Sequence, residues 1–196
     1  MTGAGEPLRV GAVVLAGGTG VRFGGIDKAS IEIRGVTLLE HALAATASAT
    51  EVVVVGDQVP TSRPVTWTVE EPPGGGPAAG LLAGTDRFHA HPDLLVVLAV
   101  DMPNVHAGTV GRLVRAVQTD PGVDGAQLVG ADGRRQPLAA VYRYTALVEA
   151  APVDVTRRHG LAVRRLVSGL RLVDVPAVGD EARDVDTWDD LRELDQ

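Results

Sequence analysis

The chain has 196 residues, a formal net charge of −7 and no cysteine, and 45% of its residues are hydrophobic although only 3% are aromatic. This length predicts one domain, and the lack of cysteine excludes disulfide bonds, thiolate nucleophiles and thiolate metal sites. The acidic charge argues against nucleic acid as a partner, and no apolar run is long enough to span a membrane. The apolar run at residues 10–15 also lacks the cationic leader of a signal peptide, so a cytoplasmic protein with no membrane partner is expected.

The first half of the chain alternates between strands and helices. We expect residues 1–9 to be disordered and residues 10–196 to form the domain. Apolar, β-branched runs predict strands and helix-forming composition predicts helices in this order: strand 10–15, helix 38–49, strands 51–55 and 65–69, helix 78–89, strand 94–100. Such alternation predicts a parallel sheet with right-handed crossovers and with helices on both of its faces.

The second half contains a candidate hairpin. After a helix at residues 107–119, strands are predicted at 125–129 and 138–143, and the glycines and aspartate between them suit a tight turn. The rest is predicted as a helix at 162–167, a strand at 171–175 and a helix at 188–194 with Asp186 or Thr187 as its N-cap. The predicted fold is α/β: a single doubly wound, mostly parallel sheet with an antiparallel edge.

The loop after the first strand is rich in glycine and ends at Lys28, which is the only lysine of the chain. In open α/β sheets ligands bind beyond the carboxyl ends of the strands, and glycine-rich loops bind anions through their backbone amides. Phe23 stands where a dinucleotide fingerprint needs its third glycine, and Asp27 and Ala29 around Lys28 exclude a P-loop. The loop predicts a phosphate site; a nicotinamide or flavin fold is weakened but not eliminated, and a plain turn remains a further alternative.

Asp101 follows the strand at residues 94–100. A carboxylate at this position could bind Mg²⁺, which proteins usually hold through one or two carboxylates together with substrate phosphate oxygens and water. An aspartate at a strand end is also a common helix N-cap, and Pro103 could open a helix. Both interpretations of Asp101 remain open on composition alone.

Five segments together resemble the molybdenum cofactor guanylyltransferases, which belong to the nucleotidyltransferase superfamily and have a Rossmann-like fold. The resemblance covers residues 10–191 and lies in these segments: Leu15-Ala16-Gly17-Gly18 with Arg22-Phe23-Gly24-Gly25 and Asp27-Lys28; Gly76-Pro77 with Gly80; Asp101-Met102-Pro103; Asp132-Gly133-Arg134-Arg135-Gln136-Pro137-Leu138; Asp186-Thr187. It implies transfer of GMP from Mg-GTP to molybdopterin, with release of pyrophosphate and no covalent nucleophile. Transient contact with molybdoenzyme-maturation proteins is a further expectation.

The resemblance also implies site residues. Lys28 and Arg22 would hold the triphosphate, and Asp101 would bind Mg²⁺ as the one metal ligand. The main chain of Leu15, Ala16, Gly17 and Gly18 would contact the nucleotide.

Two further groups of residues are implied for the base and for the acceptor. Glu70 or Glu71 would accept hydrogen bonds from guanine, although paired acids there also suit a solvated loop. Arg134, Arg135 and Gln136 would border the pterin and meet its phosphate.

Some residues depart from the family pattern. Ala78 replaces the usual leucine, and Asp184 and Asp186 replace asparagines. Gly18 favours the guanylyl branch over the related cytidylyltransferases. A CTP-dependent molybdopterin cytidylyltransferase, guanylylation of a different phosphate acceptor and a non-catalytic nucleotide-binding module remain alternatives. The pair Arg164-Arg165 is interpreted as exposed charge.

Overall fold

A seven-stranded sheet forms the centre of the protein, with strand order β5-β4-β1-β6-β8-β7-β9. The computed structural model describes residues 8–17 and 27–194. Within these residues the sheet consists of β1 Val10–Leu15, β4 Glu51–Val55, β5 Thr66–Thr68, β6 Leu94–Ala99, β7 Gly125–Val129, β8 Arg135–Arg143 and β9 Leu172–Pro176. A separate small hairpin consists of β2 Glu32–Ile33 and β3 Val36–Thr37.

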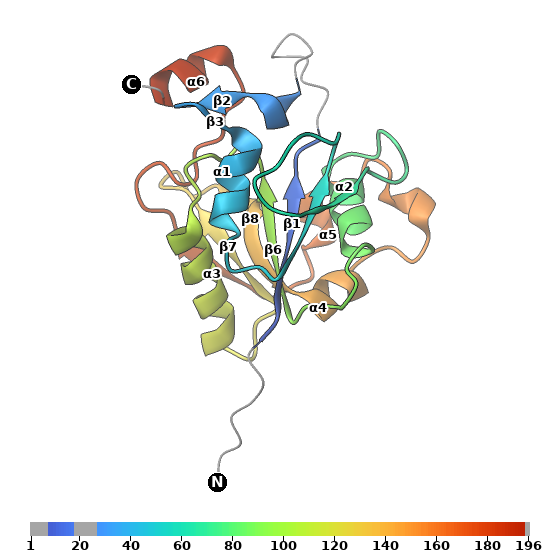
Figure 1. Ribbon diagram of the computed structural model, residues 1–196. Helices are drawn as coiled ribbons and strands as arrows, with labels where there is room; N and C mark the ends of the chain where they lie inside the picture. The colour runs from blue at the N-terminus through green and yellow to red at the C-terminus, as the bar shows by residue number, and fades with distance from the viewer. Residues whose placement is uncertain (1–7, 18–26, 195–196) are drawn as a thin grey trace.

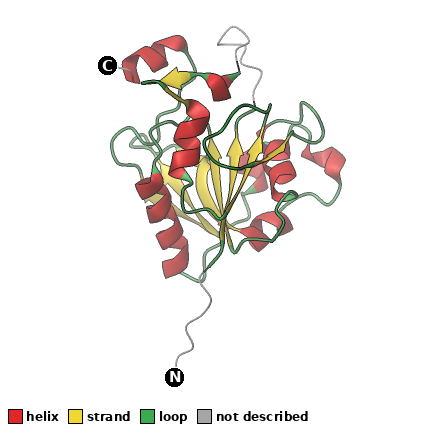
Figure 2. Cartoon of the chain, viewed as in Figure 1, coloured by secondary structure: helices red, strands yellow, loops and turns green. Residues whose placement is uncertain are grey.

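Helices connect these strands and lie on both faces of the sheet (Figures 1 and 2). They are α1 Leu38–Ala45, α2 Pro77–Thr85, α3 Ala107–Thr119, α4 Tyr144–Glu149, α5 Val163–Leu166 and α6 Trp188–Leu194, with 3-10 turns η2 Lys28–Ser30 and η3 Val155–Arg158. The predicted doubly wound α/β fold is therefore confirmed. The β2–β3 hairpin, α4 and both 3-10 turns were not predicted, because each is too short to show a hydrophobic period.

The position of the antiparallel strand differs from the prediction. The hairpin partner β8 pairs antiparallel with both β6 and β7, and β9 then pairs parallel with β7. The antiparallel strand therefore lies inside the sheet, and the edges are β5 and β9. Residues Ala139–Tyr142 of β8 are buried, as an interior strand requires. Local sequence predicts the hairpin, but the pairing of β8 with β6 depends on a long-range contact.

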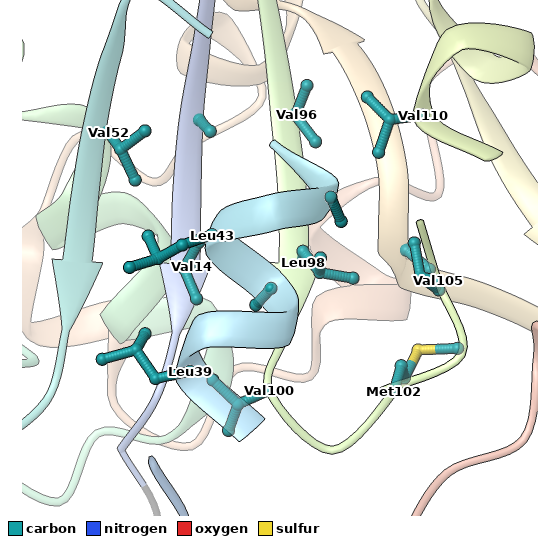
Figure 3. Close-up of a cluster of buried hydrophobic side chains, with 14 of the residues drawn as sticks. Val14, Leu39, Leu43, Val52, Val96, Leu98, Val100, Met102, Val105 and Val110 are labelled. Carbon is teal, nitrogen blue, oxygen red and sulfur yellow. The ribbon is translucent and has the colours of Figure 1, made fainter. Parts of the chain in front are cut away.

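The strand β1 joins the two hydrophobic cores of the domain. It is buried along its whole length and pairs parallel with β4 and β6. Ala12 and Val14 point to the core under α1 and α3, where Leu39 and Leu43 of α1 pack on the sheet (Figure 3). Val13 and Leu15 point to the opposite core, which is covered by α2, α4 and α5.

Helices α1 and α2 both end several residues earlier than predicted, and each ends near a threonine. The Thr46 hydroxyl donates to the carbonyls of Ala42 and Leu43 at 3.1 Å. The Thr85 hydroxyl donates to the Leu82 carbonyl at 2.7 Å. Because such a side chain occupies the carbonyls of the last turn, it competes with continuation of the helix.

Helix α2 lies close to the sheet because small residues form its contact face. A Cβ atom on Gly84 would lie 2.7 Å from Cγ1 and 3.0 Å from Cγ2 of Val13, and one on Gly80 would lie 3.3 Å from Cγ1 of Val55. All residues from Ala78 to Thr85 are buried. The close approach brings the N-terminus of α2 beside the carboxyl ends of β1 and β4.

The last helix returns to the end of the molecule where β1 finishes. There α6 lies beside the β2–β3 hairpin, and the Arg34 guanidinium donates to the Leu194 carbonyl at 2.7 Å (Figure 1). The C-terminal segment therefore passes over the carboxyl ends of the central strands. No helix among the described residues has the length and apolar character needed to cross a bilayer.

The packing of α2 predicts opposite effects for two helical glycines. Gly84→Ala should destabilise the fold by roughly 1–2 kcal/mol, because overpacking against Val13 exceeds the gain in helix propensity. Gly111→Ala in α3 should stabilise by about 0.5–1 kcal/mol, because alanine favours helix and a Cβ there meets no atom within 4 Å. Urea denaturation of both variants measures the difference, and equal stability would contradict the tight α2 contact.

Candidate active site

A cleft opens at the carboxyl ends of β1, β4 and β6, where ligands bind in open α/β sheets. It has a volume of about 720 Å³ and is named here the Lys28 cleft. Its walls come from the ends of these strands, the loop before α2, the start of η2 and the segment before α6. It is lined by Leu15, Gly17, Lys28, Glu70, Asp101 and Asp186, among others.

Lys28 is held among oxygen atoms at one side of this cleft. Its Nζ donates to Oδ1 of Asp186 at 3.0 Å and to the Val185 carbonyl at 3.3 Å, and it lies 3.6 Å from Oδ2 of Asp101. The Asp27 carboxylate caps η2 by accepting from the Ala29 N–H at 3.1 Å. Because only 17% of the Lys28 side chain is exposed, its charge is largely shielded from water and needs these partners.

Asp101 follows β6 and lies in the same cleft. Burial raises the pKa of Asp101; the Lys28 ammonium opposes this effect, and the carboxylates of Asp186 and Asp184 add to it. The Asp101 carbonyl accepts from the Val185 N–H at 2.7 Å, which ties the C-terminal segment to the end of β6. Two other carboxylates therefore act on Asp101, and a cation placed there would relieve this repulsion. In the described part of the chain, no group of three or more Asp, Glu, His or Cys side chains has the arrangement of a metal site.

A buried carboxylate holds the C-terminal segment in place. Glu181 is 4% exposed and accepts hydrogen bonds from the Thr109 hydroxyl at 2.6 Å, from the Arg112 guanidinium at 3.1 and 2.5 Å, and from the Val178 N–H at 2.8 Å. Burial would raise the pKa of Glu181, but the hydrogen bonds from Arg112, Thr109 and Val178 lower it overall. The network fixes the segment that contains Val185 and Asp186, which are the two hydrogen-bond partners of Lys28. The sequence analysis did not identify Glu181, since nothing local marks its distant partners.

The loop before α2 depends on Glu70. Its two carboxylate oxygens accept from the N–H groups of Gly74 and Gly76, both at 2.8 Å. Gly76 has a φ of 87° and is the N-cap of α2, a conformation that favours glycine. Glu70 therefore shapes the wall of the cleft, whereas Glu71 is exposed and is not among the described residues that line it.

The main chain from Leu15 to Gly17 is bonded to the neighbouring strands at the edge of the cleft, which Leu15 and Gly17 line. The N–H groups of Ala16 and Gly17 donate to the Val55 carbonyl at 2.9 and 2.8 Å, and the Leu15 carbonyl accepts from the Val100 N–H at 3.1 Å. A Cβ atom on Gly56 would lie 3.0 Å from the Gly17 nitrogen, so the two loops meet closely. The predicted site residues Gly18 and Arg22 lie outside the described residues.

Two further cavities continue from the Lys28 cleft. The middle cavity, of about 500 Å³, is lined by Asp101, Gln136, Leu138, Asp184 and Arg164, among others. The Gln136 amide donates to the Ala182 carbonyl at 3.2 Å. Gln136, which the resemblance assigned to the pterin substrate, thus lines the same cavity as Asp101.

Arg134 and Arg135 lie farther away. They line a third cavity of about 610 Å³, named here the arginine cavity, together with Gln127, Arg164 and Asp174. Arg135 forms an ion pair with Asp174, with its NH2 group 2.8 Å from Oδ2. These two predicted residues are therefore separated from the Lys28 cleft by the middle cavity.

Comparisons with known proteins agree with this geometry. Residues 12–173 match the family described as "MobA-like NTP transferase domain". A protein of Opitutus terrae named "Probable molybdenum cofactor guanylyltransferase" is 36% identical over 178 residues, which cover 87% of this chain and 85% of the relative. A "Molybdenum cofactor guanylyltransferase" of Cupriavidus metallidurans is 29% identical over 84% of this chain and 83% of its own length.

Solved structures share the fold. The molybdopterin-guanine dinucleotide biosynthesis protein A of Archaeoglobus fulgidus aligns with a TM-score of 0.72 and 21% identity, covering 94% of this chain and 96% of that chain. The 2-C-methyl-D-erythritol 4-phosphate cytidylyltransferase of Thermus thermophilus aligns with a TM-score of 0.67 and 23% identity, covering 93% and 96%. At these identities the similarity establishes the architecture alone.

The Glu181 network predicts a pH-dependent contribution to stability. Glu181→Gln should lower the free energy of unfolding at pH 7 by roughly 2–3 kcal/mol, because Arg112 and the Val178 N–H lose a charged acceptor. Because the folded-state pKa of Glu181 lies below its ordinary value, the stabilisation is present above the unfolded pKa, which is near 4.5. It is lost as pH falls through the folded pKa.

Urea denaturation of wild type and Glu181→Gln at pH 7, 5 and 4 measures this contribution. The gap between the two proteins should be largest at pH 7 and should shrink once the pH is below 4.5. The exposed pair of Arg192 and Asp189 offers a control, because Asp189→Asn should change stability by less than about 0.5 kcal/mol. A gap that is constant from pH 7 to 4 would contradict the proposed state of Glu181.

Proposed function

The chain belongs to the family of MobA-like NTP transferase domains, and on that premise we propose that it is a molybdenum cofactor guanylyltransferase. It transfers GMP from Mg-GTP to the phosphate of a molybdopterin acceptor and releases pyrophosphate. The curated relatives described above carry this name, and they match most of the chain. As a nucleotidyltransferase, the protein has to bring several negative charges together and hold two substrates in line.

The observation that carries the proposal is the meeting of Lys28 and Asp101 in one cleft. Lys28 follows the loop after β1 and Asp101 follows β6, and Nζ lies 3.6 Å from Oδ2. Parallel pairing of β1 with β6 brings their carboxyl ends together. A cation for the phosphates and a carboxylate for a metal ion therefore share one side of the cleft.

Lys28 is positioned by contacts within the chain. Asp186 and the Val185 carbonyl orient its ammonium, and the Glu181 network fixes the segment that carries both residues. An ammonium is a compact point charge that neutralises phosphate oxygens without a demand for bidentate geometry. We assign to Lys28 the binding of the triphosphate and to Asp186 the orientation of Lys28.

The residues around Asp101 fit a divalent cation. The pKa of Asp101 is raised by burial and by the neighbouring carboxylates of Asp186 and Asp184, so an added positive charge is electrostatically favourable there. Mg²⁺ suits one or two carboxylates combined with phosphate oxygens, and Asp101 would hold it with Asp186 or Asp184 nearby. When bound, the ion neutralises charge on the phosphates.

The loop before α2 is assigned to the guanine base. Each carboxylate oxygen of Glu70 already accepts one hydrogen bond from this loop. A carboxylate oxygen has a second lone pair, so Glu70 can also accept from the N1–H and the amino group of guanine. Leu15 and Gly17 line the same cleft.

The acceptor phosphate is assigned to the middle cavity. This cavity shares Asp101, Ala99 and Leu138 with the Lys28 cleft, so a group bound there can reach the α-phosphate side of the nucleotide. Gln136 offers an amide on the wall of this cavity. The two substrates then meet at Asp101.

Substitutions at Lys28 and Asp101 test the assignment. Lys28→Ala and Asp101→Asn should each lower kcat/KM for GTP by at least about 100-fold, because each removes charge stabilisation that strengthens in the transition state. Pyrophosphate release with GTP, MgCl₂ and molybdopterin measures the effect, and circular dichroism checks the fold. Asp189→Asn, at an exposed pair outside the cleft, is the matched control and should keep wild-type activity. Full activity in both site variants would overturn the roles given to them.

Nucleotide selectivity gives a separate test. In thermal-shift titrations with MgCl₂, GTP should raise the Tm at concentrations where CTP, ATP and UTP have little effect, because a ligand stabilises the fold according to its affinity. Glu70→Gln should reduce the advantage of GTP over CTP by about tenfold, since it replaces one acceptor oxygen with a donor. A wild-type preference for CTP would exclude the guanylyltransferase assignment. Binding of GTP without any turnover of molybdopterin would favour a non-catalytic module.

A further inference from the structure

The three cavities of the site are neighbours through shared lining residues. The Lys28 cleft and the middle cavity share Gly76, Pro77, Ala99, Asp101 and Leu138, and the middle cavity and the arginine cavity share Pro137 and Arg164. The first and the third share no lining residue. These shared residues place the middle cavity between the other two, and Arg164 lies where the middle cavity and the arginine cavity meet.

The far end of this series is cationic, although the chain as a whole has a net charge of −7. The arginine cavity is lined by three arginines, namely Arg134, Arg135 and Arg164, and by one carboxylate, that of Asp174. The carboxylate is already neutralised, because Arg135 bonds to it at 2.8–3.1 Å and the Gln127 amide donates to it at 2.9 Å. The remaining two guanidinium groups leave a local surplus of positive charge.

Arg164 lies at the boundary between the middle cavity and the arginine cavity. Its neighbours in α5, Val163 and Leu166, are buried in the core, and the Leu166 N–H donates to the Ala162 carbonyl at 3.1 Å. The short helix is thereby fixed while the Arg164 side chain is exposed. Among residues 8–17 and 27–194, no hydrogen bond or ion pair engages the guanidinium groups of Arg164 or Arg134.

Arg134 approaches the same cavity from the other side. It follows the turn of the β7–β8 hairpin, where its N–H donates to the Asp132 carboxylate at 2.9 Å and its carbonyl accepts from the Gly130 N–H at 2.9 Å. The main chain at Arg134 is therefore fixed and its side chain remains available. Two unpaired guanidinium groups on separate, anchored elements are suited to bind one anionic group between them.

We propose that Arg164 and Arg134 form an anion subsite for the end of the acceptor that lies opposite its reacting phosphate. The proposal rests on the guanylyltransferase function and adds a requirement to it: the acceptor carries a second anionic group. Arg164 then determines acceptor affinity without contacting the nucleotide, because it lines the middle and arginine cavities and not the Lys28 cleft. Molybdopterin offers such a group at its dithiolene end, either as the sulfur atoms or as the oxygen atoms of a bound molybdenum.

Steady-state kinetics of Arg164→Gln tests the subsite. The KM for molybdopterin should rise on the order of tenfold, which corresponds to the loss of one charge-assisted hydrogen bond, while the KM for GTP stays the same. Arg165→Gln is the matched control, because Arg165 is exposed on the same helix and is absent from the described lining of all three cavities. Arg164→Lys should recover part of the affinity, since it keeps the charge and loses the planar fork.

A comparison of two forms of molybdopterin shows which of its atoms occupy the subsite. If molybdenum-free and molybdenum-loaded molybdopterin lose affinity equally in Arg164→Gln, the sulfur atoms occupy the subsite; a larger loss for the loaded form assigns it to the metal-bound oxygens. An acceptor KM that is equal in wild type, Arg164→Gln and Arg165→Gln would overturn the subsite. In that case turnover by wild type still supports the guanylyltransferase function.

A binding measurement keeps the subsite testable if wild type shows no turnover. Sodium molybdate should raise the Tm of wild type and Arg165→Gln at a several-fold lower concentration than it does for Arg164→Gln, at constant ionic strength. Equal molybdate dependence in the three proteins would reject the subsite independently of catalysis. Absence of turnover with GTP and molybdopterin, together with a molybdate response that depends on Arg164, would instead reject the proposed function alone.

Discussion

The pairing of one ammonium with two carboxylates organises the active end of this protein. Lys28 lies near the start of the fold, and its partners Asp186 and Val185 lie 158 and 157 residues later in the chain. A largely buried ammonium is stable only with oxygen partners close by, so the C-terminal segment has to pass over the carboxyl ends of the strands. The course of residues 177–187, which connect β9 to α6, is therefore tied to the charge on Lys28.

The rest of the fold holds Lys28 and its carboxylate partners in place. Parallel pairing of β1 with β6 brings the loops that carry Lys28 and Asp101 to the same edge of the sheet. Glu181 then fixes residues 177–187 against α3, and the Val185 N–H donates a hydrogen bond to the Asp101 carbonyl at 2.7 Å. Each of these interactions is buried or partly buried, so each depends on the two hydrophobic cores that exclude water around the sheet. The arrangement of these charges is therefore supported by the packing of the fold.

Local sequence predicted most elements of the fold, because apolar runs such as residues 10–15 and 51–55 match β1 and β4 in full. It predicted α1 and α2 to be longer than they are, and threonine hydroxyls bond to carbonyls in the last turn of each helix. It also placed β8 at an edge, because strand order is set by long-range pairing. The nearness of Lys28 to Asp101 follows from the rule on strand ends. Glu181 and Arg164 could not be found in this way, since their roles depend on partners or cavities formed by distant segments.

The distribution of charge along the three cavities explains how an acidic protein can accept two anionic substrates. At the Lys28 cleft the single ammonium is already matched by Asp101 and Asp186, so a triphosphate would meet no surplus of positive charge from these residues. Asp101, whose pKa is raised by burial and by the carboxylates of Asp186 and Asp184, would hold a divalent cation bound with the nucleotide, and such an ion would supply the missing positive charge. The arginine cavity differs, because its surplus of positive charge comes from arginine side chains and does not depend on a bound ion. Cation-dependent binding at one end and fixed arginines at the other would orient an acceptor that has an anionic group at each end, with only its phosphate directed to the nucleotide.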